Sequence, residues 1–367
     1  MRKVAVFFGG KSSENEISIL TGVFVMNLLD KEKYTVLPVY IHTDGEMYTS
    51  PKMHDLAVFR EKKFSSFQKL VIYHGVAYAL RVDKGKIKRI SKIDVALNCC
   101  HGGLGEGGGV SALCEWHGIP FASPDLTSSG VFMDKSTTKT VMRGLKIPTL
   151  DYMRVNERDY EKRGTFLLKN IGARLKYPVV IKPAHLGSSI GIALAKNEAE
   201  TKTALENAFR LDNRVIIEKY LEDKRDINCA AYTLDGEIYV SEPEEAFSAG
   251  IYTFEEKYLK RKHFEKSGER KALVGELREK IRAYTKTVYK RMNLQGVVRM
   301  DFLVSGGKAY LCEVNTVPGS LAYYLFCERV TDARTFFSAL IDDALAKNTQ
   351  KQLITTGILN ETTRNFK

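Results

Sequence analysis

The sequence predicts an α/β protein of two or three domains that begins with a parallel sheet. The chain has 367 residues, which is too many for one ordinary core. Short apolar runs alternate with stretches of helical periodicity, as they do when helices cover a parallel sheet. Two glycine-rich loops, at residues 9–10 and 99–109, follow such runs at the strand ends where parallel sheets bind their ligands.

The composition argues against several classes of protein. The apolar fraction is 44%, which is typical of soluble globular proteins. No apolar run approaches the roughly 18 residues of a membrane span, and the chain starts with a strand-like run, not a signal peptide. The six cysteines lack the spacing of a disulfide framework or a metal clip. We therefore expect a cytoplasmic protein without a membrane partner.

The net charge of +12 raises the alternative of a nucleic-acid-binding protein. No helix-turn-helix, zinc or stacked-aromatic pattern accompanies the basic residues, which are scattered along the chain. We expect a solvated basic surface and no nucleic-acid partner, although a positive cleft would also suit a nucleotide.

The first domain is predicted to cover residues 1–123. Strands or extended segments are expected at residues 3–8, 34–41, 94–98 and 119–122. Helices are expected from about Ile17 and over residues 110–116. Ser13 at the N-cap and Glu16 at N3 also match a capping box, which on sequence alone explains Glu16 by a structural role.

The second domain is predicted over residues 124–216. A helix is expected over residues 133–145 and a strand over residues 179–182. A glycine-serine loop at residues 187–191 follows that strand. Its N–H groups and hydroxyls are of the kind that folds over phosphate oxygens.

The third domain is predicted over residues 217–350, with a polar tail at residues 351–367. It is expected to contain a strand at 215–221, a polar basic segment ending near 271, helices at 273–292 and 336–346, and two apolar strands joined at 306–307.

The turn between those two strands decides which side chains meet. A two-residue turn at 306–307 would put Asp301 opposite Cys312, whereas a three-residue turn at 306–308 would put it opposite Glu313. Three-residue hairpins need a residue in the left-handed region, which glycine tolerates. We therefore predict the three-residue turn.

With that register, Arg299, Asp301, Glu313 and Asn315 share one face of the strand pair. Two carboxylates and an amide suit Mg²⁺, which is usually shared between protein oxygens and nucleotide phosphates. The alternative is a salt-bridged hairpin that faces solvent. Because the flanking residues are nearly all apolar and buried polar groups need partners, we favour a metal site.

The ordered set of motifs resembles the D-alanine–D-alanine ligase family of the ATP-grasp superfamily. The resemblance lies in residues 9–18, His101-Gly102, Lys182 with residues 187–191, residues 252–258, and residues 299–319. It implies a Rossmann-like first domain followed by a two-subdomain ATP-grasp fold. It also implies a homodimer that ligates two D-alanines with ATP through an acyl phosphate, for peptidoglycan precursor synthesis.

The resemblance also implies roles for individual residues. The catalytic residues would be Glu16, Ser188, Tyr258 and Arg299. The substrate-binding residues would be Glu16, Ser18, His101, Gly319 and Ser320. The ATP-binding residues would be Lys135, Lys182, Ser188, Ser189, Glu218, Lys219, Leu221, Asp226 and Lys257. Asp301, Glu313 and Asn315 would hold two Mg²⁺ ions, or Mn²⁺ in their place.

Two positions depart from the family pattern. Gly107 stands where the family has an aspartate, and Tyr324 stands where the family has the serine that binds the second D-alanine. The second amino acid is therefore less well determined than the first. A ligase with another second amino acid, or a nucleotide-binding relative without activity, are the alternatives. Tyr258 favours an amine over a hydroxyl as the nucleophile.

Overall fold

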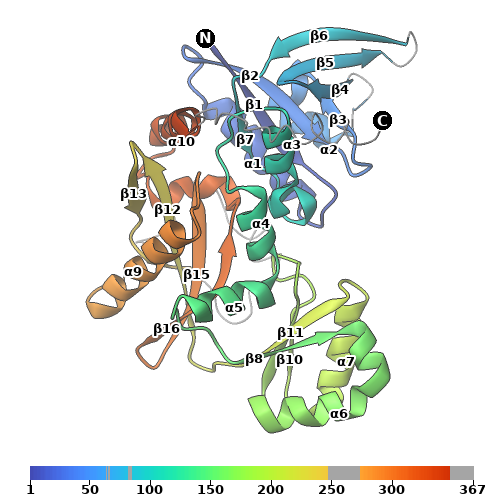
Figure 1. Cartoon of the computed structure of the whole chain (residues 1–367), viewed down its shortest axis with the longest axis vertical. Helices are drawn as coiled ribbons and strands as arrows, with labels where there is room; N and C mark the ends of the chain where they lie inside the picture. The colour runs from blue at the N-terminus through green and yellow to red at the C-terminus, as the bar shows by residue number, and fades with distance from the viewer. Residues whose placement is uncertain (63, 65–66, 82–84, 247–272, 348–367) are drawn as a thin grey trace, which may run out of the picture.

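The computed structural model describes residues 1–62, 64, 67–81, 85–246 and 273–347. The described residues form three sheets, and helices pack against each of them (Figure 1). The mixed α/β architecture, with parallel strands in the first sheet, agrees with the predicted fold class. Within the described residues, no helix is both long enough and apolar enough to span a membrane.

The first sheet has seven strands in the order β6-β5-β4-β3-β2-β1-β7. Strand β1 (Arg2–Gly9) lies between β2 (Tyr34–Ile41) and β7 (Val95–Asn98) and is parallel to both. Its apolar residues are buried on both faces, as expected for a covered parallel strand. The other strands are antiparallel and are not predicted from the sequence: β3 (Met47–Thr49), β4 (Gln68–Tyr73), β5 (Val76–Arg81) and β6 (Lys86–Lys92).

Helices α1 (Asn15–Leu28) and α3 (Val110–Trp116) follow the two glycine-rich loops, as predicted. The capping-box prediction is wrong, because Glu14 occupies the N-cap position and no side chain caps the helix. Ser12 shapes this turn instead: its hydroxyl accepts a hydrogen bond from the Glu14 N–H and donates one to the His101 carbonyl. The remaining helical segments here are η1 (Pro51–His54), α2 (Leu56–Arg60) and η4 (Gly105–Gly109).

The second sheet has four strands in the order β10-β9-β11-β8 and forms a separate layer with two helices (Figure 1). Its core consists of apolar residues that the sheet and the helices share. The elements are β8 (Tyr152–Asn156), α6 (Glu157–Leu175), β9 (Val179–Pro183), β10 (Ala193–Ala195), α7 (Glu198–Phe209) and β11 (Arg214–Lys219).

The third sheet has five strands, with β13-β12-β15-β16 in order and β14 paired to β12. Its strands are β12 (Arg225–Leu234), β13 (Glu237–Val240), β14 (Glu244–Glu245), β15 (Val298–Ser305) and β16 (Lys308–Asn315). The helical segments that follow or precede them are α9 (Glu276–Arg291), η5 (Gly319–Leu325), η6 (Val330–Asp332) and α10 (Ala333–Lys347).

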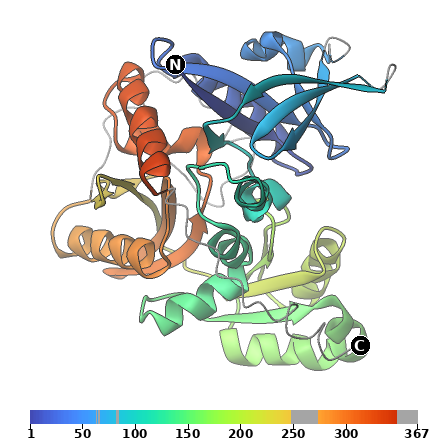
Figure 2. The same ribbon diagram turned by 45° about the horizontal axis from the view of Figure 1, so that its top comes forward.

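Helices α4 (Leu126–Met133) and α5 (Lys135–Gly144) lie between the three sheets, in teal and green in Figures 1 and 2. Their apolar side chains, including Phe132 and Met142, belong to the core of the third sheet. The second sheet begins only at Tyr152. The packing therefore groups α4 and α5 with the third sheet, although the sequence prediction placed them in the second domain.

Candidate active site

An open cavity of about 610 Å³ lies where loops from all three sheets meet. Seven of the residues predicted to form the site line it, namely His101, Lys135, Ser188, Arg299, Glu313, Asn315 and Gly319, and Glu14 lines it where Glu16 was predicted. The other lining residues are Glu106, Phe132, Met133, Leu186, Gly187, Val314, Thr316 and Val317. The fold thus unites segments that are far apart in the sequence.

The hairpin β15–β16 has the predicted register at its functional end, but a different turn produces it. Asp301 pairs with Glu313 as predicted, yet Ser305 pairs with Lys308, so the turn at 306–307 has two residues. Both glycines have positive φ, 55° and 71°, as a tight hairpin turn requires. A β-bulge between Asp301 and Phe302 then shifts the register by one residue. The three-residue turn was therefore the wrong explanation for a correct pairing.

Arg299 and Asp301 form a bidentate ion pair on strand β15 of this hairpin. Arg299 Nε lies 2.7 Å from Asp301 Oδ1, and Nη2 lies 2.8 Å from Oδ2. The third nitrogen, Nη1, donates to the Tyr324 hydroxyl at 3.1 Å. Burial disfavours the charge of Arg299, but Asp301 and Tyr324 outweigh it and hold its pKa above the ordinary value. The guanidinium is therefore fixed and charged at the cavity wall.

Glu14, directly before α1, occupies the place predicted for Glu16. Its carboxylate accepts a hydrogen bond from the Ser188 hydroxyl, while Glu16 lies in the first turn of α1 and is exposed to solvent. Glycines make the contact possible, because a Cβ at Gly102 or Gly187 would come within 2.6 or 2.5 Å of a Glu14 oxygen. The assignment of Glu16 to the site is corrected to Glu14.

The loop from His185 to Ser189 follows strand β9 and is called the phosphate loop below, after the role predicted for it from the sequence. Ser188 and Ser189 have positive φ, 51° and 61°. Lys135 Nζ donates a hydrogen bond of 2.5 Å to the Leu186 carbonyl, which ties this loop to the start of α5. Ser188 is buried and lines the cavity, whereas Ser189 does not line it.

His101 belongs to a short chain of hydrogen bonds that includes a residue not predicted from the sequence. Its Nε2 lies 2.8 Å from Thr21 Oγ1, and the same oxygen accepts a hydrogen bond from the Ser320 N–H at 3.2 Å. Thr21 lies one helical turn after Ser18 on the buried side of α1. That spacing is the only sequence signal for it.

Ser18 serves the fold rather than the cavity wall. It is fully buried, its hydroxyl donates to the Cys99 carbonyl at 2.8 Å, and it accepts from the Gly9 N–H at 2.6 Å. It therefore joins the ends of β1 and β7. Because the hydroxyl is used by the backbone, the structure does not support direct substrate binding by its side chain. Ser320 meets this network through its backbone N–H and does not line the cavity.

Glu106 is a site residue that sequence reasoning did not select, although it lies in the second glycine-rich loop. Its carboxylate accepts hydrogen bonds from the N–H groups of Gly102 at 2.7 Å and Val317 at 3.3 Å. Burial, followed by the nearby charge of Glu14, raises the pKa of Glu106 to about 7. Glu106 thus joins two loops of the cavity and titrates near neutral pH.

Comparisons with known proteins identify the family. One family model, described as D-ala D-ala ligase N-terminus, matches residues 3–124, and another, described as D-ala D-ala ligase C-terminus, matches residues 141–346. The chain belongs to the D-alanine–D-alanine ligase family. The predictions of this family, of an ATP-grasp fold and of a ligase are confirmed.

Individual relatives match over nearly their whole length. The D-alanine–D-alanine ligase of Thermosipho melanesiensis is 33% identical over 359 residues, covering 94% of this chain and 93% of the relative. The crystal structure of the Helicobacter pylori ligase is 27% identical, with a TM-score of 0.75 over 96% of this chain and 100% of that chain. The VanG D-Ala:D-Ser ligase from Enterococcus faecalis shares the fold at 24% identity, with a TM-score of 0.72 over 95% and 99% of the two chains.

The donor set on the ligase hairpin fits Mg²⁺ by its chemistry. Glu313 and Asn315 line the cavity, and Asp301 lies beside them. Asp301 Oδ1 already accepts from Asn228 at 2.7 Å, and Oδ2 accepts from Asn315 at 3.1 Å. Among the described residues, no three His, Cys, Asp or Glu side chains form a metal group by themselves, so amide and phosphate oxygens would complete the coordination.

A buried charge cluster adjoins the cavity of the ligase. Glu218 Oε1 lies 2.6 Å from Lys139 Nζ, and Glu218 Oε2 lies 2.5 Å from Lys182 Nζ. Burial opposes these charges, but Cys312 and then Glu218 raise the pKa of Lys182, and Lys139 and then Lys182 lower the pKa of Glu218. Lys182 also contacts the sulfur of Cys312, the bulged residue of β16, at 3.7 Å. Lys139 was not predicted, although it lies four residues after Lys135 on α5 and hence on the same face.

The other described residues that the sequence assigned to ATP do not line the cavity. Lys219 is exposed at the end of β11 and Leu221 is half-buried after it. Asp226 on β12 is paired with Lys224, whose Nζ lies 2.5 Å from Asp226 Oδ2. Lys257 and Tyr258, assigned to the lid, lie outside the residues that the structure describes, as does the tail at 351–367.

Proposed function

We propose that this cavity is the reaction centre at which the ligase joins two D-alanines with ATP, through an acyl phosphate, for peptidoglycan precursor synthesis. The observation that carries the proposal is the convergence of Glu14, Arg299 and Glu313 on one cavity, with Asp301 paired to Glu313 on the hairpin. These groups offer an anion for an ammonium, a cation for an oxyanion and oxygen ligands for a metal.

The nucleotide is held by groups from two sheets. Lys135, Lys182 and the phosphate loop, with Ser188 and Ser189, contact the phosphates, together with Lys257. Glu218, Lys219 and Leu221 bind the adenine, and Asp226 binds the ribose. Two Mg²⁺ ions, or Mn²⁺ in their place, held by Asp301, Glu313 and Asn315, would neutralise the phosphate charge.

The reaction follows in two displacements. A carboxylate oxygen of the first D-alanine attacks the γ-phosphorus of ATP, the bond from that phosphorus to ADP breaks, and an acyl phosphate forms. Glu14 holds the ammonium of this D-alanine, with His101 beside it. The neutral amine of the second D-alanine then attacks the acyl carbon, and phosphate and a proton leave. Arg299 stabilises the oxyanion; removal of one such donor typically costs about 10²–10³ in rate.

Tyr324 bears on the choice of the second amino acid. Its hydroxyl oxygen accepts a hydrogen bond from Arg299, so its own hydrogen is available for a carboxylate. A phenol here replaces the serine of the family pattern and, with Gly319 and Ser320 nearby in the chain, would bind the second carboxylate. The competing proposal is a different second amino acid, since a D-Ala:D-Ser ligase has the same fold.

Phosphate release across a panel of amino acids separates these two proposals. With ATP and Mg²⁺, D-alanine alone should give phosphate and D-alanyl-D-alanine, whereas L-alanine alone should give neither. If D-alanine alone gives little product but D-alanine with D-serine or another amino acid gives much more, the competing proposal holds.

We also propose that the ligase acts as a cytoplasmic homodimer without nucleic-acid or membrane partners. The support is the family membership, together with basic residues that are scattered along the chain and carry no binding motif.

Tyr258 in the lid would complete the catalytic group with Glu14 and Ser188.

A further inference from the structure

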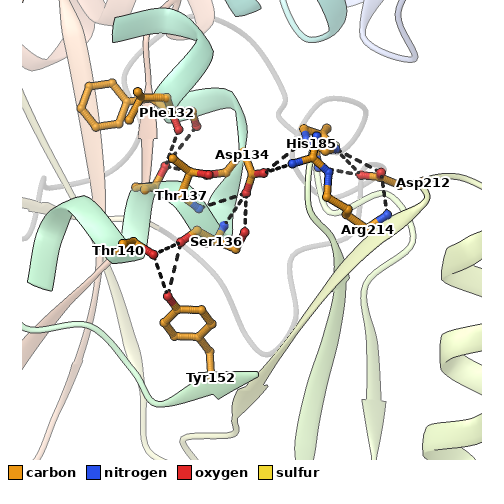
Figure 3. Close-up of polar contacts among 11 residues, drawn as sticks. Phe132, Asp134, Ser136, Thr137, Thr140, Tyr152, His185, Asp212 and Arg214 are labelled. Carbon is orange, nitrogen blue, oxygen red and sulfur yellow. Dashed lines mark hydrogen bonds and ion pairs between the residues drawn. The ribbon is translucent and has the colours of Figure 1, made fainter. Parts of the chain in front are cut away.

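A compact charged group lies at the base of the phosphate loop, where α5, the loop and β11 meet (Figure 3). It consists of Asp134, His185, Asp212 and Arg214, and is called the His185 network below. Asp134 comes from the start of α5, His185 from the loop, and the other two from the start of β11 and the residues before it. None of these four residues lines the cavity.

The imidazole of His185 lies between two carboxylates. Its Nδ1 is 2.9 and 3.0 Å from the two oxygens of Asp212, and its backbone N–H donates to Asp212 Oδ2 at 2.8 Å. Its Nε2 lies 3.5 Å from Asp134 Oδ2. Arg214 completes the group, with Nη1 donating to Asp134 Oδ2 at 2.8 Å and its backbone N–H donating to Asp212 Oδ1 at 3.1 Å.

The network is connected to the residues proposed to bind phosphate. Asp134 caps α5 by accepting from the N–H groups of Ser136 and Thr137. The next residue, Lys135, holds both neighbours of His185: its N–H donates to the Ala184 carbonyl at 3.1 Å and its Nζ to the Leu186 carbonyl at 2.5 Å. A shift of His185 would therefore move the Lys135 ammonium and the loop that carries Ser188.

The charges of the network balance only when His185 is protonated, because two aspartates then face one arginine and one imidazolium. The carboxylates of Asp134 and then Asp212 raise the pKa of His185 to about 9. Burial works to raise the pKa of Asp134, but hydrogen bonds from His185, Ser136 and Thr137 hold it well below its usual range. At neutral pH the network is thus a closed set of ion pairs.

We propose that His185 is a positioning residue for the nucleotide: as an imidazolium it fixes the phosphate loop against α5, so that Lys135 and Ser188 are placed before ATP binds. The proposal rests on the assignment of that loop to the phosphates made above. Without the imidazolium, the loop must be ordered by ATP itself, which lowers nucleotide affinity. Loss of one charge-assisted hydrogen bond corresponds to roughly tenfold or more in affinity.

The test compares full-length His185→Gln, His185→Arg and wild type, with His117→Gln at the end of α3 as a matched histidine control. KM for ATP and for D-alanine, and Kd for ADP, are measured from pH 7 to pH 10. We expect His185→Gln to raise KM for ATP and Kd for ADP about tenfold at pH 7.5, with KM for D-alanine within about twofold. His117→Gln should match wild type. Above pH 9, the affinity of the wild type for ADP should approach that of His185→Gln. His185→Arg should keep its affinity for ADP at that pH.

A purely structural role would lower only the active fraction, and hence kcat, with both KM values and the pH profile unchanged; that result would overturn the proposal. A further variant, Lys135→Ala, tests the assignment of the loop to the phosphates separately from the positioning role of His185. If Lys135→Ala raises KM for ATP and His185→Gln does not, the positioning role is wrong. If neither variant changes it, the assignment of the loop to the phosphates fails as well.

Discussion

Glu14 at the start of α1 accepts a hydrogen bond from Ser188, which lies 174 residues further along the chain. This contact joins the first domain to the phosphate loop, and both residues line the cavity. Gly102 and Gly187 leave room for it. The neighbouring Glu16 points to solvent, so the two glutamates of one motif have different surroundings.

That difference gives a matched pair of variants. Glu14→Gln removes the charge proposed to hold the ammonium of the first D-alanine, and a hydrogen bond to a charged group contributes about 1.5–3 kcal/mol. We expect kcat/KM for D-alanine to fall by about ten- to a hundredfold. Steady-state phosphate release measures it, and Glu16→Gln should stay within about twofold of wild type. Equal losses in the two variants would contradict the placement of Glu14.

The hairpin shows how far sequence reasoning reached and where it stopped. Both strands were predicted from apolar patterns, and the pairing of Asp301 with Glu313 was predicted from an assumed three-residue turn. The prediction of a three-residue turn was wrong because a β-bulge at Cys312 shifts the register by one residue. Such a bulge depends on the packing of the strands rather than on the local sequence. A two-residue period cannot show where such an extra residue is inserted.

Contacts over long separations explain the other differences. The sequence alone does not distinguish Glu14 from Glu16, and only the contact of Ser188 with Glu14 does so. Lys139 and His185 carry no motif, and their roles follow from contacts with Glu218 and Asp212 on neighbouring elements. The antiparallel strands β3–β6 are short or mixed in polarity, so their pattern does not stand out.

The hairpin carboxylates give a prediction on metal dependence. Glu313→Gln should raise the Mg²⁺ concentration for half-maximal activity by about tenfold or more, because a neutral amide is a weaker ligand for a hard cation. Titration of activity with Mg²⁺ at saturating ATP measures it. Glu237→Gln, at an exposed position on β13 of the same sheet, is the control. An unchanged Mg²⁺ titration in Glu313→Gln would exclude Glu313 as a ligand.

Glu106 gives a prediction on pH and stability. Its pKa is raised from 4.5 to about 7, so between these values the folded protein holds a proton that the unfolded chain has lost. The free energy of unfolding therefore falls as pH rises through this window. Glu106→Gln is neutral throughout, and its melting temperature relative to wild type should rise between pH 5 and pH 8. Thermal unfolding at several pH values measures this, and exposed Glu328→Gln should follow wild type. A constant difference between Glu106→Gln and wild type would contradict the raised pKa.

The cluster of Lys139, Glu218 and Lys182 gives a prediction on stability. Glu218→Gln would leave two buried ammonium groups without a counter-charge, and breaking a buried pair in this way typically costs about 3–5 kcal/mol. Adding Lys139→Met to Glu218→Gln should restore part of this loss, because one unpaired charge is removed. Urea unfolding of the two single variants and the double variant measures it. Additive losses in the double variant would mean that the two groups do not interact.

The union of the hairpin, the phosphate loop and Glu14 in one reaction centre is tested most directly by a crystal structure of the ligase grown with ADP, Mn²⁺ and D-alanine. An anomalous difference map locates the manganese. We predict manganese bound by Asp301, Glu313 and Asn315, with the ammonium of D-alanine on Glu14. Manganese away from this hairpin, or D-alanine bound without Glu14, would contradict it.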